Sequence, residues 1–364
     1  MSKITSIATS TPAYGHTQES LGAFADMVYC TDAAESRKLK FLYRHSGIEK
    51  RYSVLADFNL PASERTFFSD RADLEPFPSL EKRMKYYHDT SVHLSVKAVK
   101  DCIAGKITAS EITHLITVSC TGMSAPGLDL QIMEAMELSP NLQRTSVNFM
   151  GCYAAIHGLK LANAFCNSTP HANVVVVCTE LCTLHFQKEN TVNNILSSLL
   201  FSDGCGAMLV QNNSSSKGLS LQHFFSQVSF KGKNDMSWEL SGKGFLMTLT
   251  GYVPELIKED FDMLVTKALQ SAGKTKEDIT HWCIHPGGKK ILQVIEKSLE
   301  LKPDDLHYSY DILKNYGNMS SASIVFVLQK MIQELEQNNT TSARVFGAAF
   351  GPGLTMETFL ASYD

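Results

Sequence analysis

Short apolar runs alternate with longer amphipathic stretches along this chain, and the alternation predicts an α/β fold. The run from Val174 to Cys178 has the length of a buried strand, and the segment 1–5 alternates as another strand would. The stretches 152–165 and 318–329 place apolar residues at helical spacing and are apolar on nearly all sides, as buried helices are. Strands and helices that alternate in this way form a mostly parallel, buried sheet.

The same order of features occurs twice. The tripeptide Ile-Thr-His ends at His114 and again at His281, each time before a run of strand length. A turn with Pro and Gly, an amphipathic stretch and a Gly before a small-residue helix start follow in both copies. His114 precedes Cys152 by 38 positions, and His281 precedes Asn318 by 37. This conserved order and spacing predicts a duplicated α/β unit.

A polar stretch at 211–218 separates the copies and predicts two halves, 1–216 and 217–364. The first half carries an insertion around residues 30–90 that is rich in charge and aromatic side chains. We expect two α/β/α halves with mixed, mostly parallel sheets and buried central helices. Two such halves facing each other would bring Cys152 and Asn318, at the starts of the central helices, close to a pseudo-two-fold axis.

Composition and charge narrow the class of protein. The 364 residues are 44% hydrophobic and 19% charged, which excludes a disordered chain and a coiled coil. The net charge is −4, so the protein has no overall positive field that would attract nucleic acid. No apolar run approaches the roughly 18 residues of a membrane helix, and segment 1–5 lacks the pattern of a signal peptide. Nine cysteines, an odd number, favour reduced thiols in the cytoplasm. We therefore expect a cytoplasmic protein without membrane insertion.

Cys152 is the candidate nucleophile. It lies between a Gly and a run of small residues at a predicted helix start, where backbone N–H groups stabilise negative charge. A thiol in such a place can have its pKa lowered to roughly 3.5–7.5. A small buried structural thiol is the usual interpretation of a cysteine, and we keep it for most of the others. The position of Cys152 opposite Asn318 in the duplication favours chemistry instead.

His285 and Asn318 are the candidate partners of this thiol. His285 ends the first predicted strand of the second copy, and open α/β sheets bind ligands beyond the carboxyl ends of their strands. Asn318 offers an amide donor that stays neutral at any pH. A Cys, a His and an Asn on one axis predict acyl transfer through a thioester, with the His and Asn donating to the oxyanion. A satisfied core histidine is the alternative interpretation of His285.

Other chemistries have weaker support in the sequence. Cys178, Cys182 and His185 form a C-x3-C-x2-H pattern, but no second pair follows at a zinc-site spacing. The chain has no G-x-S-x-G elbow, G-x-G-x-x-G turn or Walker loop. We therefore expect neither a metal nor a nucleotide cofactor.

A basic cluster stands out between Ser36 and Arg51, with Glu49 as its single acid. Its members are Arg37, Lys38, Lys40, Arg44, Lys50 and Arg51. A solvated helix face is the default interpretation. The functional alternative is an anchor for a substrate that carries phosphates.

Several motifs resemble the chalcone synthase family, the type III polyketide synthases, over nearly the whole chain. The motifs are GC at 151–152, LFSDG at 200–204, HPGG at 285–288, YGNMSSA at 316–322 and AFGPGLT at 349–355. The family shares the thiolase fold with ketoacyl-acyl carrier protein synthase III, and the last two motifs separate it from these relatives.

The resemblance implies a role for each candidate. Cys152 would carry the acyl group, and His285 and Asn318 would act in decarboxylation and on the oxyanion. Phe201 would be the gate between the coenzyme A tunnel and the cavity. An acyl-CoA starter would load the cysteine, and malonyl-CoA would extend it repeatedly before cyclisation, without an acyl carrier protein. The substrates would be CoA thioesters, no further cofactor is implied, and the family is homodimeric.

The resemblance also implies cavity and coenzyme A contacts. The cavity residues would be Cys120, Cys182, His185, Ser197, Met247, Ser320 and Phe350. The coenzyme A contacts would be Lys38, His45, Arg51, Gly287 and Gly288. Met247 stands where the family usually has a phenylalanine. The cysteine at position 120 is similar to the residue that bacterial members have there, and those members make alkylpyrones, alkylresorcinols or tetrahydroxynaphthalene. We therefore expect an aliphatic starter and an alkylpyrone- or alkylresorcinol-type product rather than a product of a coumaroyl thioester.

Two other functions stay open. One is a synthase III that performs a single condensation onto acyl carrier protein. The other is a catalytically silent thiolase-fold subunit that only pairs with a partner, although the intact set of Cys152, His285 and Asn318 argues against it.

Overall fold

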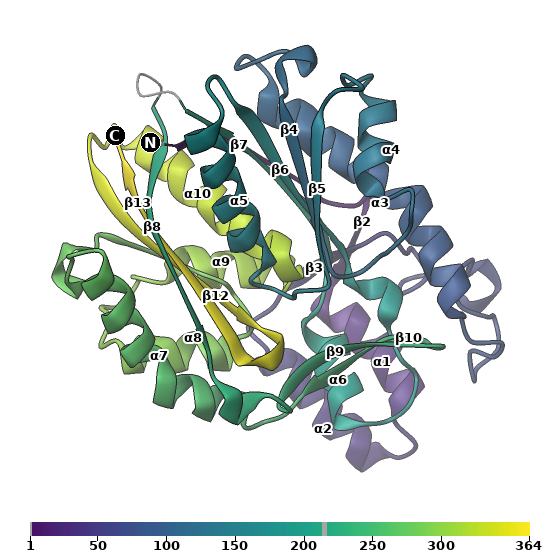
Figure 1. Cartoon of the computed structure of the whole chain (residues 1–364). Helices are drawn as coiled ribbons and strands as arrows, with labels where there is room; N and C mark the ends of the chain where they lie inside the picture. Colours follow the sequence, from purple (N-terminus) through teal and green to yellow (C-terminus); the bar gives the residue numbers. More distant parts are fainter. Residues whose placement is uncertain (1, 213–216) are drawn as a thin grey trace.

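A nine-stranded sheet runs through the molecule, and both halves of the sequence contribute to it (Figure 1). The computed structural model describes residues 2–212 and 217–364. The spatial order is β11-β12-β13-β8-β1-β7-β6-β4-β5. These strands are β1 (Lys3–Ser10), β4 (His114–Ser119), β5 (Gln143–Asn148), β6 (Asn173–Leu181), β7 (Asp203–Gln211), β8 (Leu219–Val228), β11 (His281–Ile284), β12 (Ala343–Gly351) and β13 (Thr355–Tyr363).

Most strands within each half run in one direction. β4 pairs in parallel with β5 and β6, and β1 runs the same way because β1 and β6 are both antiparallel to β7. In the other half, β11, β12 and β8 share one direction and β13 is reversed. The antiparallel pair β1–β8 joins the halves. The mixed, mostly parallel α/β architecture predicted from the sequence is confirmed, with one reversed strand in each half.

The order of elements shows the predicted duplication. β1, β4, β6 and β7 correspond to β8, β11, β12 and β13, and His114 pairs with Val174 as His281 pairs with Val345. The helices α3 (Leu80–Ile103) and α5 (Ala154–Ser168) correspond to α7 (Val253–Ser271) and α10 (Ser323–Gln337). Only the first half adds a fifth strand, β5, which follows α4 (Leu128–Ala135). The second half has α8 (Lys289–Ser298) and α9 (His307–Tyr316) in that interval.

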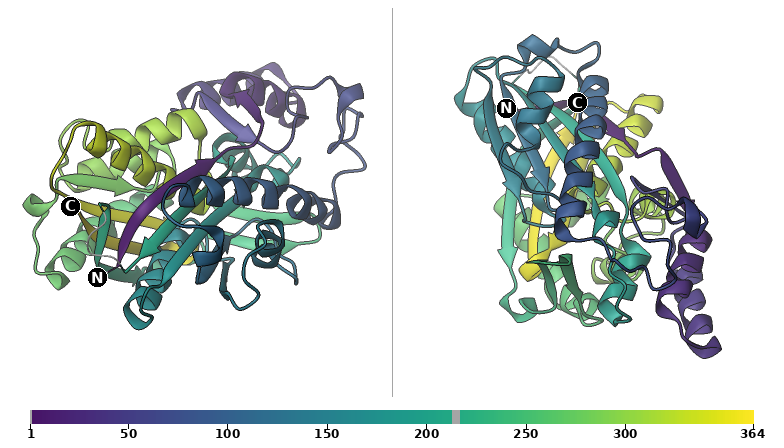
Figure 2. Two further views of the ribbon diagram at one scale, coloured as in Figure 1. Left: turned by 90° about the horizontal axis from the view of Figure 1, so that it is seen from above. Right: turned by 90° about the vertical axis from the view of Figure 1, so that its right-hand side faces the viewer.

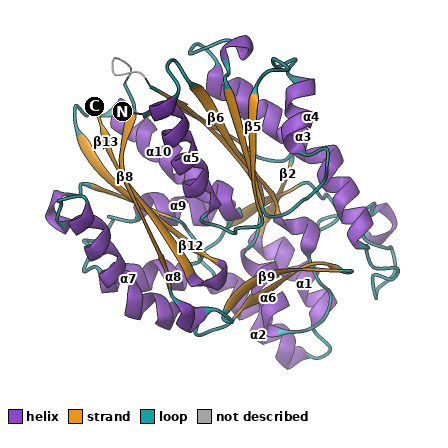
Figure 3. Ribbon diagram, viewed as in Figure 1, coloured by secondary structure: helices purple, strands orange, loops and turns teal. Residues whose placement is uncertain are grey.

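The two central helices are buried, and helices lie on both faces of the sheet (Figure 3). α5 packs on β4 and β6, and α10 packs on β1, β7 and β11. The approach of α5 is close, because a Cβ added at Gly158 would lie 2.7 Å from Cγ1 of Val176. The strands and these two helices share one apolar cluster, which includes Leu159, Val325 and Phe359. This layer holds the starts of both helices in place.

The insertion in the first half begins earlier than the sequence suggested. The segment of residues 11–79, between β1 and α3, is much longer than the matching interval of the second half, residues 229–252 between β8 and α7. It forms β2 (Tyr14–Thr17), α1 (Gln18–Tyr29), α2 (Ala33–His45) and β3 (Lys50–Ser53), and the strands β2 and β3 pair. α1 packs on α2 and on α6 (Val192–Leu200), and α6 in turn packs on β10 (Gly244–Leu249), which forms a hairpin with β9 (Met236–Ser241) (Figure 1).

The ends of the described chain lie side by side (Figure 2). Nζ of Lys3 is 3.2 Å from Oδ1 of Asp364. The predicted boundary at 216/217 falls partly on 213–216, which lie outside the described residues, so the division into halves at that point stays a prediction. Across residues 2–212 and 217–364, no helix has both the length and the apolar character needed to cross a membrane.

Short 3₁₀ helices span Ala62–Glu64, Ala109–Glu111, Cys182–His185, Phe230–Gly232, Lys276–Asp278, Ser320–Ala322 and Pro352–Leu354.

Candidate active site

Cys152, His285 and Asn318 line one cavity. Cys152 lies just before α5, His285 directly follows β11, and Asn318 follows α9. The two halves therefore meet at this cavity, as the duplication predicted. Other residues named from the sequence line it too, namely Cys120, Cys182, Phe201, Met247, Gly287, Ser320 and Phe350.

The loop that carries Cys152 is fixed by glycines from both halves. Gly151 has a φ of 98°, a conformation that favours glycine, and a Cβ there would lie 2.2 Å from Cδ of Pro352. A Cβ at Gly351 would lie 3.1 Å from the backbone nitrogen of Cys152. The turn at the end of β12 thus packs directly on the backbone of Cys152. This close packing explains the glycines at 151 and 351, which belong to the motifs GC and AFGPGLT.

The electrostatics of the thiol differ from the expectation for a helix start. The pKa of Cys152 is raised to about 12, mainly because the thiol is buried; a hydrogen bond with Ser320 opposes the rise and the Glu180 carboxylate adds to it. The predicted lowering of this pKa is therefore wrong for the isolated thiol. Removal of water from the thiolate outweighs the helix-end dipole in a cavity this enclosed.

His285 is equally desolvated. Burial lowers the pKa of its imidazole to about 3, so the ring is neutral. Neither ring nitrogen has a hydrogen-bond partner among the described residues. One nitrogen of a neutral ring is an acceptor and the other a donor, so His285 can take one proton and give another.

The backbone and side chain of Asn318 are oriented by hydrogen bonds. Its Oδ1 accepts from the backbone N–H of Ser320 at 2.9 Å, and its Nδ2 donates to the carbonyl of Gly287 at 3.3 Å. Its backbone N–H donates to the carbonyl of Leu200, and its own carbonyl accepts from Ser202. The bond to Gly287 uses one of the two Nδ2 protons, so the second can serve a ligand.

Phe201 lies between this cavity and a second one. It lines both cavities, directly after α6, and forms an isolated parallel bridge with Asn318. Nη1 of Arg51 donates to the carbonyl of Phe201 at 2.6 Å. The backbone of the predicted gate is thus tied to the insertion and to the second half.

The second cavity receives two of the residues predicted for the substrate pocket. His185 and Ser197 line it rather than the first, while Met247 and Cys182 line both. The ring of His185 stacks on Phe245 with centroids 4.2 Å apart. Its Nε2 donates to the carbonyl of Thr121 and its Nδ1 accepts from the N–H of Phe245, and burial lowers its pKa to about 3. His185 is a neutral wall residue here.

The predicted coenzyme A contacts divide into exposed and buried groups. Lys38 and His45 are exposed on α2, and Gly47, after the end of this helix, lies against the side chain of Lys289. Gly287 lines the first cavity, and Gly288 lies next to Leu200. Arg51 instead points inward. A buried guanidinium that donates to a carbonyl of the chain is poorly placed to bind a phosphate in solvent. The structure therefore places Arg51 away from the exposed side where coenzyme A phosphates would lie.

Sequence reasoning missed one wall residue, Trp238, and one buried acid next to the wall, Glu180. Trp238, on β9, faces Met247 on β10 as its cross-strand partner and donates from Nε1 to the carbonyl of Cys120 at 2.7 Å. Glu180, at the end of β6, accepts from the backbone of Cys120 and from Thr121. Burial raises its pKa to about 7. The sequence did contain a signal for each. Trp238 is a single Trp in a segment with the alternation of a hairpin, and Glu180 is an acid near the end of a valine-rich strand.

The structure shows no cluster of three or more metal-ligating side chains within the described ranges. The C-x3-C-x2-H pattern has one end inside the sheet, since Cys178 is fully buried on β6. Cys182 and His185 belong to the 3₁₀ helix that follows β6, where both line the second cavity.

Known proteins resemble this chain along its whole length. The model of the chalcone and stilbene synthase N-terminal domain matches residues 1–214, and that of the C-terminal domain matches 220–362. The "alpha-pyrone synthesis polyketide synthase-like Pks18" of Mycobacterium tuberculosis is 33% identical over 288 residues, which cover 78% of this chain and 73% of that protein. "Type III polyketide synthase C" of Arabidopsis thaliana is 29% identical over 92% of this chain and 87% of its own.

Solved structures agree with the fold. PKS-I from the brown alga Ectocarpus siliculosus superposes with a TM-score of 0.92 at 24% identity, covering 100% of this chain and 98% of that one. The bacterial tetrahydroxynaphthalene synthase of Streptomyces coelicolor gives a TM-score of 0.87 at 24% identity, covering 100% and 99%. With two family models that together span nearly every residue, the chain belongs to the chalcone and stilbene synthase family and is a type III polyketide synthase, an acyltransferase with the thiolase-like fold.

Proposed function

We propose that Cys152 carries the acyl group and that His285 and Asn318 serve both thioester exchange and malonyl decarboxylation. The observation that supports this most directly is that the three side chains line one buried cavity formed by both halves. Their chemistry is complementary: one nucleophile, one proton acceptor and donor, and one neutral donor whose orientation is fixed.

Loading begins with proton transfer from Cys152 to His285. Burial makes a lone thiolate and a lone imidazolium costly, as the shifts of both pKa values show. Formed together in the cavity, the two opposite charges stabilise each other. The Cys152 sulfur then bonds to the acyl carbon, the acyl–sulfur bond of the starter breaks, and the CoA thiolate takes the proton from His285.

Extension follows at the same place. Malonyl-CoA loses CO₂, and the electron pair of the broken C–C bond forms an enolate. N–H groups of His285 and Asn318 donate to the enolate oxygen. The enolate carbon attacks the thioester, a C–C bond forms, and the Cys152 thiolate leaves, so the extended chain is now a thioester of CoA. Cys152 then attacks this thioester, the chain returns to its sulfur, and CoA leaves as the thiol before the next extension. Cyclisation after several such cycles gives the product.

The starter is aliphatic, and the product is of the alkylpyrone or alkylresorcinol type. The walls of the first cavity, which Cys152 also lines, include the apolar side chains of Met236, Leu249 and Ile291. Met247 is unbranched and adapts to irregular apolar volumes, where a phenyl ring would be rigid. A relative's name, which refers to α-pyrone synthesis, agrees with this proposal. Lys38 and His45 on α2 would bind the CoA phosphates at the exposed side.

One assay separates this proposal from its rivals. The purified protein is incubated with malonyl-CoA and a series of acyl-CoA starters without carrier protein, and product masses are measured. Multiply extended, cyclised products are expected. Products that form only with acyl carrier protein after one condensation would indicate a synthase III. If no starter acylates Cys152, the result would support the alternative of a catalytically silent subunit.

We also infer a homodimer in a reducing compartment such as the cytoplasm. β5 forms one edge of the sheet with several exposed positions, and Met123 and Leu130 near it are exposed apolar side chains. Open edges and exposed apolar groups favour pairing with another chain. All nine cysteines are free thiols, which suits a reducing compartment. Light scattering after size exclusion would reveal a monomer if the dimer is wrong.

A further inference from the structure

The second cavity continues from the catalytic one. Cys182, Phe201, Trp238 and Met247 line both, so the two spaces share a wall at the predicted gate. The second cavity's remaining lining combines polar side chains with apolar and aromatic ones. It includes Leu21, Phe24, Phe58, Phe186 and Phe245. A chain of methylene groups that passes Met247 would meet these side chains next.

A polar pair closes part of this cavity. His16 and Arg51 are directly opposite each other in the antiparallel pair β2–β3, so their side chains project from the same face. Both line the cavity, and their exposed fractions are only 2% and 4%. Nδ1 of His16 and Nη2 of Arg51 have no hydrogen-bond partner among the described residues.

The other nitrogens of the pair are occupied, which fixes what the unpartnered atoms can do. Nε2 of His16 donates to the carbonyl of Leu55 at 2.9 Å, so Nδ1 is the acceptor of a neutral ring. Burial lowers the pKa of His16, in agreement with a neutral ring, although the Leu55 carbonyl and the nearby Asn59 side chain act in the opposite direction. Nε of Arg51 donates to Gln18 and Nη1 to Phe201, which leaves Nη2 as a donor. The cavity thus presents one donor beside one acceptor.

The Arg51 charge lacks a carboxylate partner in the part of the chain that the structure describes. Asp203 is near enough to affect its pKa, but that carboxylate accepts from Thr183 and from the N–H of Val54. The hydroxyl of Tyr43 is close enough to the guanidinium to interact as a weak hydrogen-bond acceptor, but it is neutral and does not balance the charge. A buried polar group without a partner costs free energy. A ligand oxygen at Nη2 would remove that cost.

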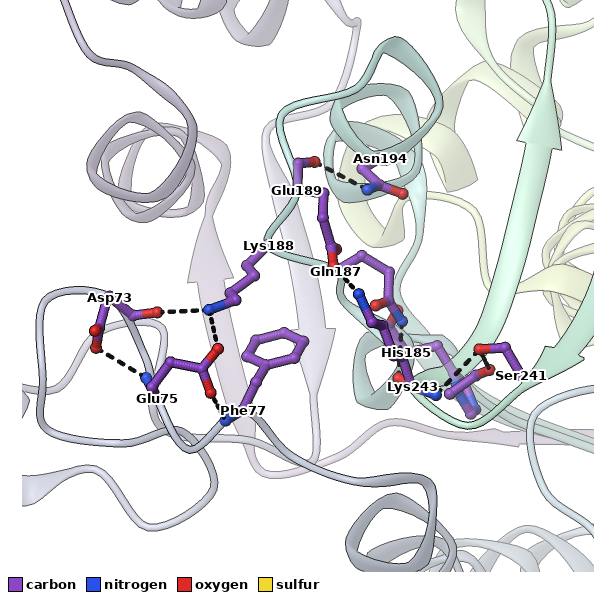
Figure 4. Close-up of polar contacts among 11 residues, drawn as sticks. Asp73, Glu75, Phe77, His185, Gln187, Lys188, Glu189, Asn194, Ser241 and Lys243 are labelled. Carbon is purple, nitrogen blue, oxygen red and sulfur yellow. Dashed lines mark hydrogen bonds and ion pairs between the residues drawn. The ribbon is translucent and has the colours of Figure 1, made fainter.

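A third residue with an unpartnered buried atom, Gln187, lines the same cavity. Gln187 is 5% exposed, and its Nε2 donates to the carbonyls of His185 and Lys243 (Figure 4). Its Oε1 has no partner among the described residues. The cavity wall therefore offers a second acceptor besides His16, whereas Arg51 supplies the donor.

We propose that this second cavity binds the far end of the acyl starter and that Arg51 and His16 together recognise a hydroxyl group there. A hydroxyl accepts from Nη2 of Arg51 and donates to Nδ1 of His16 at once, which satisfies both atoms. A carboxylate would suit Arg51 but would face the lone pair of His16, and a methyl end would satisfy neither. This inference extends the proposed function from an aliphatic starter to a hydroxylated one.

The test compares starters of equal chain length that end in a methyl, a hydroxyl or a carboxylate, each as its CoA thioester over a series of lengths. The measured quantity is kcat/KM with malonyl-CoA. At the length that spans both cavities, the hydroxylated starter should exceed the methyl one by roughly 10- to 100-fold, the size expected for one hydrogen bond to a charged group. A preference for the methyl or the carboxylate end at every length would overturn the inference.

Two variants and a control show where the preference arises. His16→Phe should remove most of the preference, and His16→Gln, which keeps an acceptor, should retain part of it. His114→Phe changes another buried histidine with an unpartnered ring nitrogen, outside both cavities, and should keep the preference. An unchanged preference in His16→Phe, with the variant folded by circular dichroism, would refute the assignment.

The same experiment distinguishes this inference from the proposed function. Mass spectrometry of the enzyme after incubation with the methyl-ended starter reports acylation of Cys152 independently of the far end. If Cys152 is acylated and the hydroxyl confers no advantage, only the recognition by Arg51 and His16 is refuted. If no starter acylates Cys152, the proposed function itself is wrong.

Discussion

The two halves of the chain share one frame and carry different chemistry on it. Where the first half has Cys152 before α5, the second has Asn318 before α10. Where β6 carries Glu180, the position of β12 in the same register is Gly351, because Val174 and Val345 pair with equivalent histidines. The duplicated frame places these positions near one another. In the proposed function, the substitutions between copies divide the reaction into a nucleophile from one half and oxyanion donors from the other.

The halves also differ in what is added to the frame. The first half gains α1, α2, β2 and β3, which form the exposed basic helix and part of the second cavity. The second half gains the hairpin β9–β10, which supplies Trp238 and Met247 between the two cavities. The proposed function therefore assigns catalysis to the repeated part and substrate selection to the parts that are not repeated. The predictions below separate these two contributions.

The largest effect is expected at the nucleophile. Cys152→Ala should abolish both the acyl-enzyme and condensation, because neither Cys120 nor Cys182 occupies the helix start at the meeting point of the halves. Mass spectrometry after incubation with an acyl-CoA should find a single adduct in the parent and none in the variant. Cys166→Ala, a buried thiol at the far end of α5, is the matched control and should keep full activity. An adduct that survives in Cys152→Ala would contradict the assignment.

The next effect concerns the donor from the second half. Asn318→Ala should lower malonyl-CoA decarboxylation by roughly 10²–10³-fold, the usual loss for one oxyanion donor. Starter loading should fall less, since His285 still takes the thiol proton. CO₂ release and acyl-enzyme formation are measured separately. Asn315→Ala, on α9, changes an amide that bonds only to Asp311 and serves as the control. Equal losses in both steps would argue against the division of roles.

The repeated frame was predictable from sequence, and so was the meeting of its chemical residues. A pattern that recurs at fixed spacing fixes the order of strands, and paired copies place Cys152 and Asn318 together. The inward direction of Arg51 was not predictable, because a basic cluster in a sequence does not reveal which member lies beneath the helix. The raised pKa of Cys152 was missed for a similar reason: desolvation depends on walls, such as Trp238, that come from distant segments.

Charge on the added helix α2 should affect binding alone. Lys38→Glu should raise KM for CoA thioesters several-fold, because an exposed anion would repel the phosphates of the handle. N-acetylcysteamine thioesters, which carry no phosphates, should show nearly unchanged KM. Lys106→Glu, an exposed lysine just after α3, makes the same change of charge as a control. Similar losses for both kinds of thioester would make α2 an ordinary solvated face.

The hairpin of the second half should set the length of the starter. Met247→Phe places a rigid ring opposite Trp238, between the two cavities, and should shift the product masses toward shorter starters. Cys152 should stay reactive toward iodoacetamide. The neighbouring Leu246 points to the other face of the hairpin and is partly exposed, so Leu246→Phe should leave the profile unchanged. Undiminished use of long acyl-CoA starters by Met247→Phe would remove Met247 as the determinant.

The smallest effect is expected at the position where β6 has an acid and β12 a glycine. Burial raises the pKa of Glu180 from 4.5 to about 7, even though Cys120, Thr121 and Ser321 donate to it. Between these two pH values the folded protein holds a proton that the unfolded chain releases, so Glu180 makes the free energy of unfolding fall as the pH rises. Glu180→Gln has no such proton and should lose this part of the slope between pH 4.5 and 7.

Urea unfolding at several pH values measures the difference between parent and variant. The stability of the parent relative to Glu180→Gln should be highest near pH 4.5 and should decline until about pH 7. Glu81→Gln, on an exposed part of α3, removes a carboxylate without burial and should follow the parent. Because every other group titrates alike in parent and variant, a constant difference across the interval would show that Glu180 is ionised in the fold. The three hydrogen-bond donors would then offset the free energy that it takes to bury an ionised carboxylate at this end of β6. The presence of an acid in β6 where β12 has Gly351 would then not affect the pH dependence of stability.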